Sequence, residues 1–171
     1  GNRDIVLYGK GFIEDVLCGC RFKLSPQSFY QINSVQTELL YNKAMEYAAL
    51  TERDTVLDTY CGIGTIGIIA AKEAGKVIGV ELNKEAVKDA TVNADKNSLN
   101  NIKFYNADAT KFMLEASESD LKPTVVFMDP PRSGSTEEFL DALIRMKPER
   151  IVDISCGPES LKRDLQYITR K

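Results

Sequence analysis

From residue 55 onward, short apolar runs alternate with longer stretches in which polar and apolar positions recur at helical spacing. Runs rich in β-branched residues predict buried strands. They span residues 55–59, 76–81, 102–105, 124–128 and 151–155. The predicted helices span residues 65–74, 83–98, 108–116, 135–146 and 158 to the end. This alternation is typical of an α/β fold, a mostly parallel, doubly wound sheet with helices on both faces.

Capping residues mark several helix ends. Gly75 follows the first of these helices in the C-cap position, and Asn83 precedes the second as an N-cap. Ser135-x-x-Glu138 predicts a capping box that opens the helix ending near Met146.

The first part of the chain has a different pattern. Its β-like runs, punctuated by glycines, predict a hairpin or meander and cover residues 5–8, 12–17 and 21–24. Asn33-x-x-Gln36 then predicts the start of a helix that continues to about Leu50, with Val35, Leu39 and Met45 facing the core. We therefore divide the chain into a short β segment, residues 1–30, and an α/β domain, residues 31–171.

The amino-acid composition excludes several kinds of catalytic and metal-binding site. The 171 residues include no histidine, which excludes Ser-His-Asp and Cys-His pairs and His-ligated metal sites within this chain. No apolar run reaches the roughly 18 residues of a membrane span. The net charge of -3 gives no global signal for nucleic acid. Four cysteines without a secretory pattern favour a reducing, cytoplasmic setting over a disulfide framework, and Cys18-x-Cys20 lacks the spacing of a metal site.

The chemically suggestive residues follow the predicted strands. Right-handed crossovers place the loops after parallel strands at one edge of the sheet, where open α/β sheets bind ligands. After the first strand, Gly62 and Gly64 let the backbone approach a ligand, but Gly67 is out of register for a dinucleotide fingerprint. A nucleoside contact is therefore favoured over a pyrophosphate cradle. Glu81, which ends the second strand, can accept both hydroxyls of a ribose.

Later loops add further candidates. Asp108 can contact an adenine amino group or cap a helix. Asp129-Pro130-Pro131-Arg132 holds a carboxylate and an arginine in rigid, extended backbone, which suits a planar heterocycle. Cys156 precedes the last helix, whose dipole can favour a thiolate, so it is the candidate nucleophile. Cys61, the other thiol at this edge, is interpreted as packing.

These motifs, with Ser25-Pro26-x-Ser28-Phe29-Tyr30-Gln31 upstream and Ser155-Cys156-Gly157-Pro158 downstream, resemble the RNA (uracil-5-)-methyltransferase family over nearly the whole chain. The resemblance implies a Rossmann-like S-adenosylmethionine-dependent methyltransferase fold. It also implies methyl transfer to carbon 5 of a uridine in RNA. The expected substrate is 23S rRNA, and uridine 54 of tRNA is the alternative. Gly157 stands where the family more often has Asn.

The resemblance also assigns residue roles. Cys156 would attack carbon 6 of the uracil, while Asp129 and Arg132 orient the base or stabilise its developing charge. The cofactor-binding positions would be Gln31, Tyr60, Gly62, Gly64, Thr65, Glu81, Asp108 and Asp129. No metal is implied.

The same resemblance implies that parts of the family pattern lie outside the chain. An RNA-binding β-barrel would precede Gly1, and a Thr-x-His-Val-Glu segment with the general-base Glu and the last two strands would follow Lys171. We therefore expect five core strands and a domain incomplete at its C-terminus. We also expect a monomer with a free sheet edge open to pairing, and a chain that is inactive on its own. The alternatives are a non-catalytic cofactor-binding module and a methyltransferase that acts on protein or a small molecule.

Overall fold

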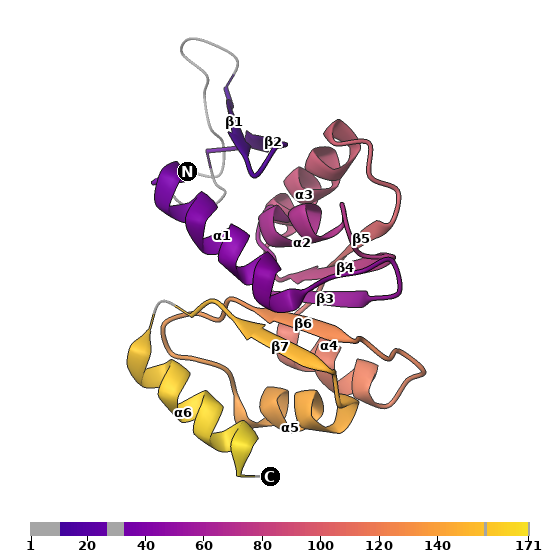
Figure 1. The fold of residues 1–171 in the computed structure, drawn as a ribbon, viewed down its shortest axis with the longest axis vertical. Helices are drawn as coiled ribbons and strands as arrows, with labels where there is room; N and C mark the ends of the chain where they lie inside the picture. Colours follow the sequence, from indigo (N-terminus) through magenta and orange to yellow (C-terminus); the bar gives the residue numbers. More distant parts are fainter. Residues whose placement is uncertain (1–10, 27–32, 156, 171) are drawn as a thin grey trace.

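The computed structural model describes residues 11–26, 33–155 and 157–170. A small hairpin precedes a five-stranded sheet that lies between two layers of helices (Figure 1). The strands are β1 (Ile13–Leu17), β2 (Cys20–Leu24), β3 (Thr55–Thr59), β4 (Lys76–Glu81), β5 (Ile102–Asn106), β6 (Val125–Met128) and β7 (Arg150–Asp153). The helices are α1 (Ser34–Ala48), α2 (Thr65–Ala70), α3 (Lys84–Lys96), α4 (Ala109–Ser117), α5 (Glu137–Met146) and α6 (Pro158–Thr169). Within these residues, no helix is both long and apolar enough to cross a membrane.

The large sheet is parallel throughout and has the order β5-β4-β3-β6-β7. The chain therefore moves outward from β3 to β5, returns to the other side of β3, and moves outward again to β7. This reversal makes the sheet doubly wound and creates a switch point between β3 and β6. The predicted fold class is confirmed, and β7 lies at one edge of this sheet, as expected.

Alternate residues of each strand feed two separate cores. Val56, Val77 and Val125 pack on one face with α1, α2 and the hairpin. Leu57, Ile78 and Val126 pack on the other face with α4 and α5. The near-continuous apolar runs seen in the sequence result from burial on both faces of the sheet.

The hairpin is attached to the domain through polar side chains of α3. Asn93 accepts a hydrogen bond from the Lys23 amide and donates one to its carbonyl, and Asn97 does the same with Arg21. These reciprocal bonds satisfy the outer edge of β2 and fix its position on the domain. The expected hairpin is therefore present at β1 and β2, whereas the run at residues 5–8 lies outside the described residues.

The predicted inner face of α1 is wrong. Val35 and Leu39 are 67% and 61% exposed, whereas Tyr41, Ala44 and Ala48 are buried. Met45 is partly buried against the core, as expected. Ala44 and Ala48 allow the helix a close approach to the domain, and Tyr41 fills the space beside them. This inner face was not visible in hydrophobicity alone. Its N-cap is Asn33, as predicted, and the Asn33 side chain accepts a hydrogen bond from the Gln36 amide.

Two predicted caps also need correction. Helix α5 is capped by Thr136 and not by Ser135, since Thr136 accepts the Phe139 amide while the Ser135 amide donates to Asp164. Helix α2 ends at Ala70, several residues before Gly75. Gly75 instead allows a close backbone approach, because an added Cβ there would lie 2.1 Å from the Glu52 carbonyl oxygen.

Replacement of Gly75 by Ala is therefore expected to destabilise the protein by about 1–3 kcal/mol, because the Glu52 backbone must move to admit the methyl group. Urea unfolding measures the loss. Lys76→Ala, at the exposed neighbouring position, is the control and should stay within about 0.5 kcal/mol of wild type. Equal stability of the Gly75→Ala protein would contradict the close approach.

Candidate functional site

The candidate site lies at the carboxyl edge of the sheet, where the loops after β3 and β6 flank the switch point. The loop after β3 has an unusual backbone, with positive φ angles at Tyr60, Gly62 and Gly64. A Cβ on Gly64 would lie 2.7 Å from the Phe104 ring, whereas one on Gly62 would meet nothing within 4 Å. Gly64 therefore serves packing, and Gly62 exposes backbone that a ligand can approach.

Asp58, in β3, is hydrogen-bonded to the helix that follows this glycine loop. Its Oδ2 accepts the Gly67 amide at 2.8 Å, and the side chain is fully buried. The other oxygen, Oδ1, has no hydrogen-bond partner within the described residues. Burial, the lowering effect of the Gly67 amide and the raising effect of the nearby Asp129 and Glu81 charges together raise the pKa of Asp58 to about 8. Near neutral pH this carboxyl is therefore largely protonated.

Glu81 links the glycine loop to the start of α3. Its Oε2 accepts the Gly62 amide at 3.0 Å, and its Oε1 accepts the Asn83 amide at 2.7 Å. Two bonds to backbone hold the carboxylate at the end of β4, in the position expected from the sequence. Each oxygen keeps a second lone pair, so Glu81 can still accept hydroxyl donors from a ligand.

Other predicted cofactor positions have visible structural roles. Asp108 is the N-cap of α4 and accepts the Lys111 amide at 3.0 Å. Thr65 begins α2 and is buried. The Tyr60 ring packs against Phe139 with centroids 5.6 Å apart, and burial raises its pKa. Tyr60 therefore forms an apolar wall beside the loop.

On the other side of the switch point, Asp129 follows β6 at the opening of the proline-rich loop. Burial and, to a smaller extent, the Asp153 charge together raise the pKa of Asp129 to about 6. Asp153, at the end of β7, is itself raised in pKa by burial, while its carboxylate accepts the Ser155 amide at 2.8 Å. Arg132 is exposed in the same loop.

The structure thus brings several carboxyl groups to one edge of the sheet. Asp58, Glu81, Asp129 and Asp153 come from four adjacent strands. Near neutral pH Asp58 is largely neutral, but the remaining carboxylates of this partly buried edge favour a positively charged ligand over a neutral one. Among the described residues, no cluster of three or more His, Cys, Asp or Glu side chains is arranged to hold a metal ion.

Two predicted residues, Gln31 and Cys156, lie outside the described residues. The rival thiol, Cys61, is buried, and burial raises its pKa well above the usual value. That environment makes Cys61 a poor nucleophile. Cys18 and Cys20 are free thiols, and burial raises both pKa values.

Sequence reasoning assigned no role to Asp58 or Asp153. Each had a readable signal, since an acid that adjoins buried apolar residues of a strand must be paired, neutral or functional. Asp58 in Thr55–Thr59 and Asp153 in Arg150–Asp153 both fit that description. Their effect on Asp129 depends on strand order, which periodicity does not specify.

The raised pKa values predict a pH dependence of stability. The ordinary value for Asp58 is 3.8 and the folded value is about 8, so the folded protein holds a proton that the unfolded chain has lost. Stability therefore falls as pH rises from about 4 to about 8. Asp58→Asn stays uncharged and should be about 1 kcal/mol or more stable than wild type at pH 8.

Urea unfolding at pH 5, 6, 7 and 8 measures this difference. Asp120→Asn, at an exposed position, is the matched control and should follow the wild-type curve. If the Asp58→Asn and wild-type curves run parallel across this range, Asp58 does not carry the shifted proton.

Comparison with solved structures supports a relation to nucleic-acid methyltransferases. The Pyrococcus abyssi tRNA (uracil-54, C5)-methyltransferase, solved with S-adenosyl-L-homocysteine, matches with a TM-score of 0.79 and 34% identity over 94% of this chain and 38% of that one. A S-adenosylmethionine-dependent methyltransferase of Agrobacterium tumefaciens matches with a TM-score of 0.73 and 18% identity, over 95% of this chain and 59% of that one. The second likeness concerns the fold alone.

Sequence relatives point the same way. A Staphylococcus aureus protein described as an uncharacterised RNA methyltransferase is 50% identical over 171 residues, which are 100% of this chain and 38% of the relative. One from Caldanaerobacter subterraneus is 48% identical over 98% of this chain and 37% of its own length. The chain thus spans less than half the length of these relatives. The family model described as tRNA (uracil-5-)-methyltransferase matches residues 10–171. The chain therefore belongs to the tRNA (uracil-5-)-methyltransferase family.

Proposed function

We propose that this chain is the catalytic part of an enzyme that transfers a methyl group from S-adenosylmethionine to carbon 5 of a uridine in RNA. The observation that carries the proposal is the pairing, across the switch point, of a glycine loop and Glu81 with the Asp129 loop. Family membership supports uracil as the target base. We further propose that the enzyme acts in the cytoplasm as a monomer.

Two RNA substrates fit this proposal. Ribosomal RNA, and specifically 23S rRNA, is the first candidate. Uridine 54 of tRNA is the second, and it is favoured by the likeness to the Pyrococcus abyssi enzyme, at 34% identity. In either RNA the target base must leave its stack to enter a pocket at the sheet edge.

The residues present fit S-adenosylmethionine. Glu81 has lone pairs left for the two ribose hydroxyls, and the Gly62 backbone faces open space. The carboxyl groups of Asp129 and Asp153 favour a cationic ligand over a neutral one. We also propose contacts from Gln31, Tyr60, Gly64, Thr65 and Asp108. When bound, the cofactor supplies a methyl group on a sulfonium, and its demethylated form has lost that positive charge.

The protein's own groups would prepare the uracil. The Cys156 thiolate attacks carbon 6, and the displaced electron pair makes carbon 5 nucleophilic. After carbon 5 gains the methyl group, a base removes its proton and the bond from carbon 6 to sulfur breaks, which restores the thiolate. Asp129 orients the base, and Arg132 stabilises the charge that develops on the uracil oxygen.

Calorimetric titration with S-adenosylhomocysteine tests the cofactor half of the proposal. Glu81→Ala should weaken binding about ten- to a hundredfold, because it removes the ribose acceptor and releases the Gly62 amide. Glu85→Ala, which removes an exposed carboxylate from α3, should bind like wild type. Equal affinity of both variants would argue against the assignment of Glu81.

Incubation of the full-length protein with cofactor and 5-fluorouridine RNA tests the nucleophile. Fluorine cannot leave as a proton does, so the covalent complex should persist in a denaturing gel. Wild type and Cys61→Ala should form it, and Cys156→Ala should not. Parallel reactions with 23S rRNA and tRNA transcripts distinguish the two substrates. An adduct that survives Cys156→Ala would reject the assignment.

A further inference from the structure

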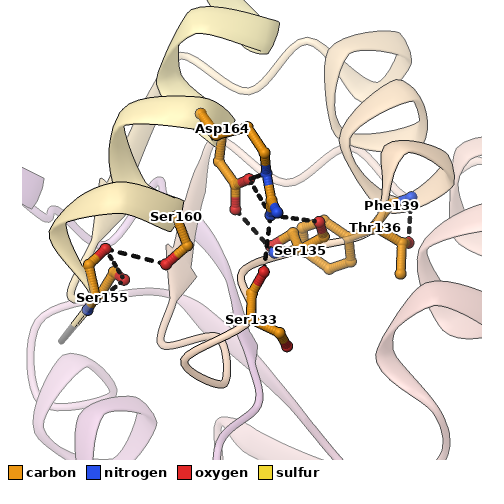
Figure 2. A network of polar contacts seen from close by, with 9 residues as sticks. Ser133, Ser135, Thr136, Phe139, Ser155, Ser160 and Asp164 are labelled. Carbon is orange, nitrogen blue, oxygen red and sulfur yellow. Dashed lines mark hydrogen bonds and ion pairs between the residues drawn. The ribbon is translucent and has the colours of Figure 1, made fainter.

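The proline-rich loop after β6, residues 129–135, is held by a compact polar network from α6 (Figure 2). Arg163 Nη2 donates to the Ser133 carbonyl at 2.9 Å and to the Ser135 carbonyl at 3.2 Å. Asp164 Oδ2 accepts the Ser135 amide at 2.8 Å. Consecutive residues of one helix thus bind both carbonyl and amide groups of the loop.

Arg163 and Asp164 also stabilise each other. Arg163 Nε and Nη2 both donate to Asp164 Oδ1, at 3.0 and 2.7 Å. The Asp164 side chain is 1% exposed, whereas that of Arg163 is 57% exposed. A buried carboxylate is stable only when hydrogen-bond donors and a positive charge offset its loss of hydration. Removal of Arg163 therefore leaves the Asp164 charge without its cationic partner.

Gly134 shows how closely α6 approaches the loop. It has a φ of +81°, and an added Cβ would lie 2.2 Å from Arg163 Nη2 and 2.9 Å from the Ser160 Cβ. The Gly134 amide donates to the Pro131 carbonyl at 2.8 Å, which closes a turn that contains Arg132. The turn and the helix therefore fit together only with a residue that has no side chain.

The same end of α6 holds the residue after the candidate nucleophile. Ser160 Oγ donates to the Gly157 carbonyl at 3.0 Å, and the Gly157 amide donates to Ser155 Oγ at 3.2 Å. A Cβ on Gly157 would lie 3.3 Å from the Arg132 carbonyl oxygen. Helix α6 therefore binds the proline-rich loop through Arg163 and Asp164 and binds Gly157 through Ser160, and Gly157 in turn binds Ser155.

We propose that Arg163 and Asp164 are positioning residues. They hold the proline-rich loop, residues 129–135, at a set distance from the residues flanking Cys156, so that one uracil can contact both Arg132 and the nucleophile. The inference rests on the methyl transfer proposed above. Arg163 and Asp164 need not touch RNA or cofactor. Their effect passes through the backbone of Ser133 and Ser135, and it should appear in the rate of the covalent step rather than in cofactor affinity.

Single-turnover adduct formation with 5-fluorouridine RNA tests the inference in the full-length protein. Arg163→Gln should slow the adduct about ten- to a hundredfold at saturating RNA, with little change in the affinity for S-adenosylhomocysteine. Arg163→Lys, which keeps the charge and can still reach a carbonyl, should recover part of the rate. Lys162→Gln, which removes the same charge from the adjacent exposed position, should leave the rate at saturation unchanged.

A second variant covers the case in which Arg163→Gln fails to fold. Asp164→Asn keeps an acceptor for the Ser135 amide but loses the charge that orients Arg163, so it should also slow the adduct and increase hydrogen exchange at residues 133–135. Wild-type adduct rates in a folded Arg163→Gln or Asp164→Asn protein would overturn the inference. Failure of the wild-type protein itself to form an adduct would instead reject the proposed function, and the positioning role with it.

Discussion

The parallel pairing of β3 with both β4 and β6 is the constraint on which the rest of the structure depends. Because β3 has neighbours on both sides, the chain must leave it in one direction and return in the other. The loops after β3 and β6 then start side by side and separate toward opposite faces of the sheet. The glycine loop and the Asp129 loop owe their proximity to this topology, and no direct hydrogen bond between them is required.

That topology also concentrates charge. Asp58, Glu81, Asp129 and Asp153 lie near one another because parallel strands end at the same edge. In water these carboxyls would all be ionised, but burial and mutual repulsion raise the pKa values of Asp58 to about 8 and of Asp129 to about 6. A cationic ligand at this edge relieves the repulsion between the ionised carboxylates.

Sequence patterns predicted strand bounds and N-caps correctly where interactions between neighbouring residues decide the structure. β3 and β4 were predicted with their observed bounds, because short runs of β-branched residues between turn signals favour buried strands. The Asn33 and Asn83 caps were correct, since an N-cap is satisfied within three residues. Ser135 failed as a cap because its amide has a distant acceptor, Asp164, which competes with the local pattern.

The sequence by itself determined the fold class, the succession of strands and helices along the chain, and the positions of Glu81, Asp108 and Asp129 at or just after the ends of their strands. These features follow from periodicity, capping and the shared edge of parallel strands. Only the tertiary structure decided the inner face of α1, the role of Gly75, the proton held by Asp58 and the attachment of α6 to the Asp129 loop. Each of these depends on groups far apart in sequence, and their free energies come from burial and close approach that no local pattern encodes.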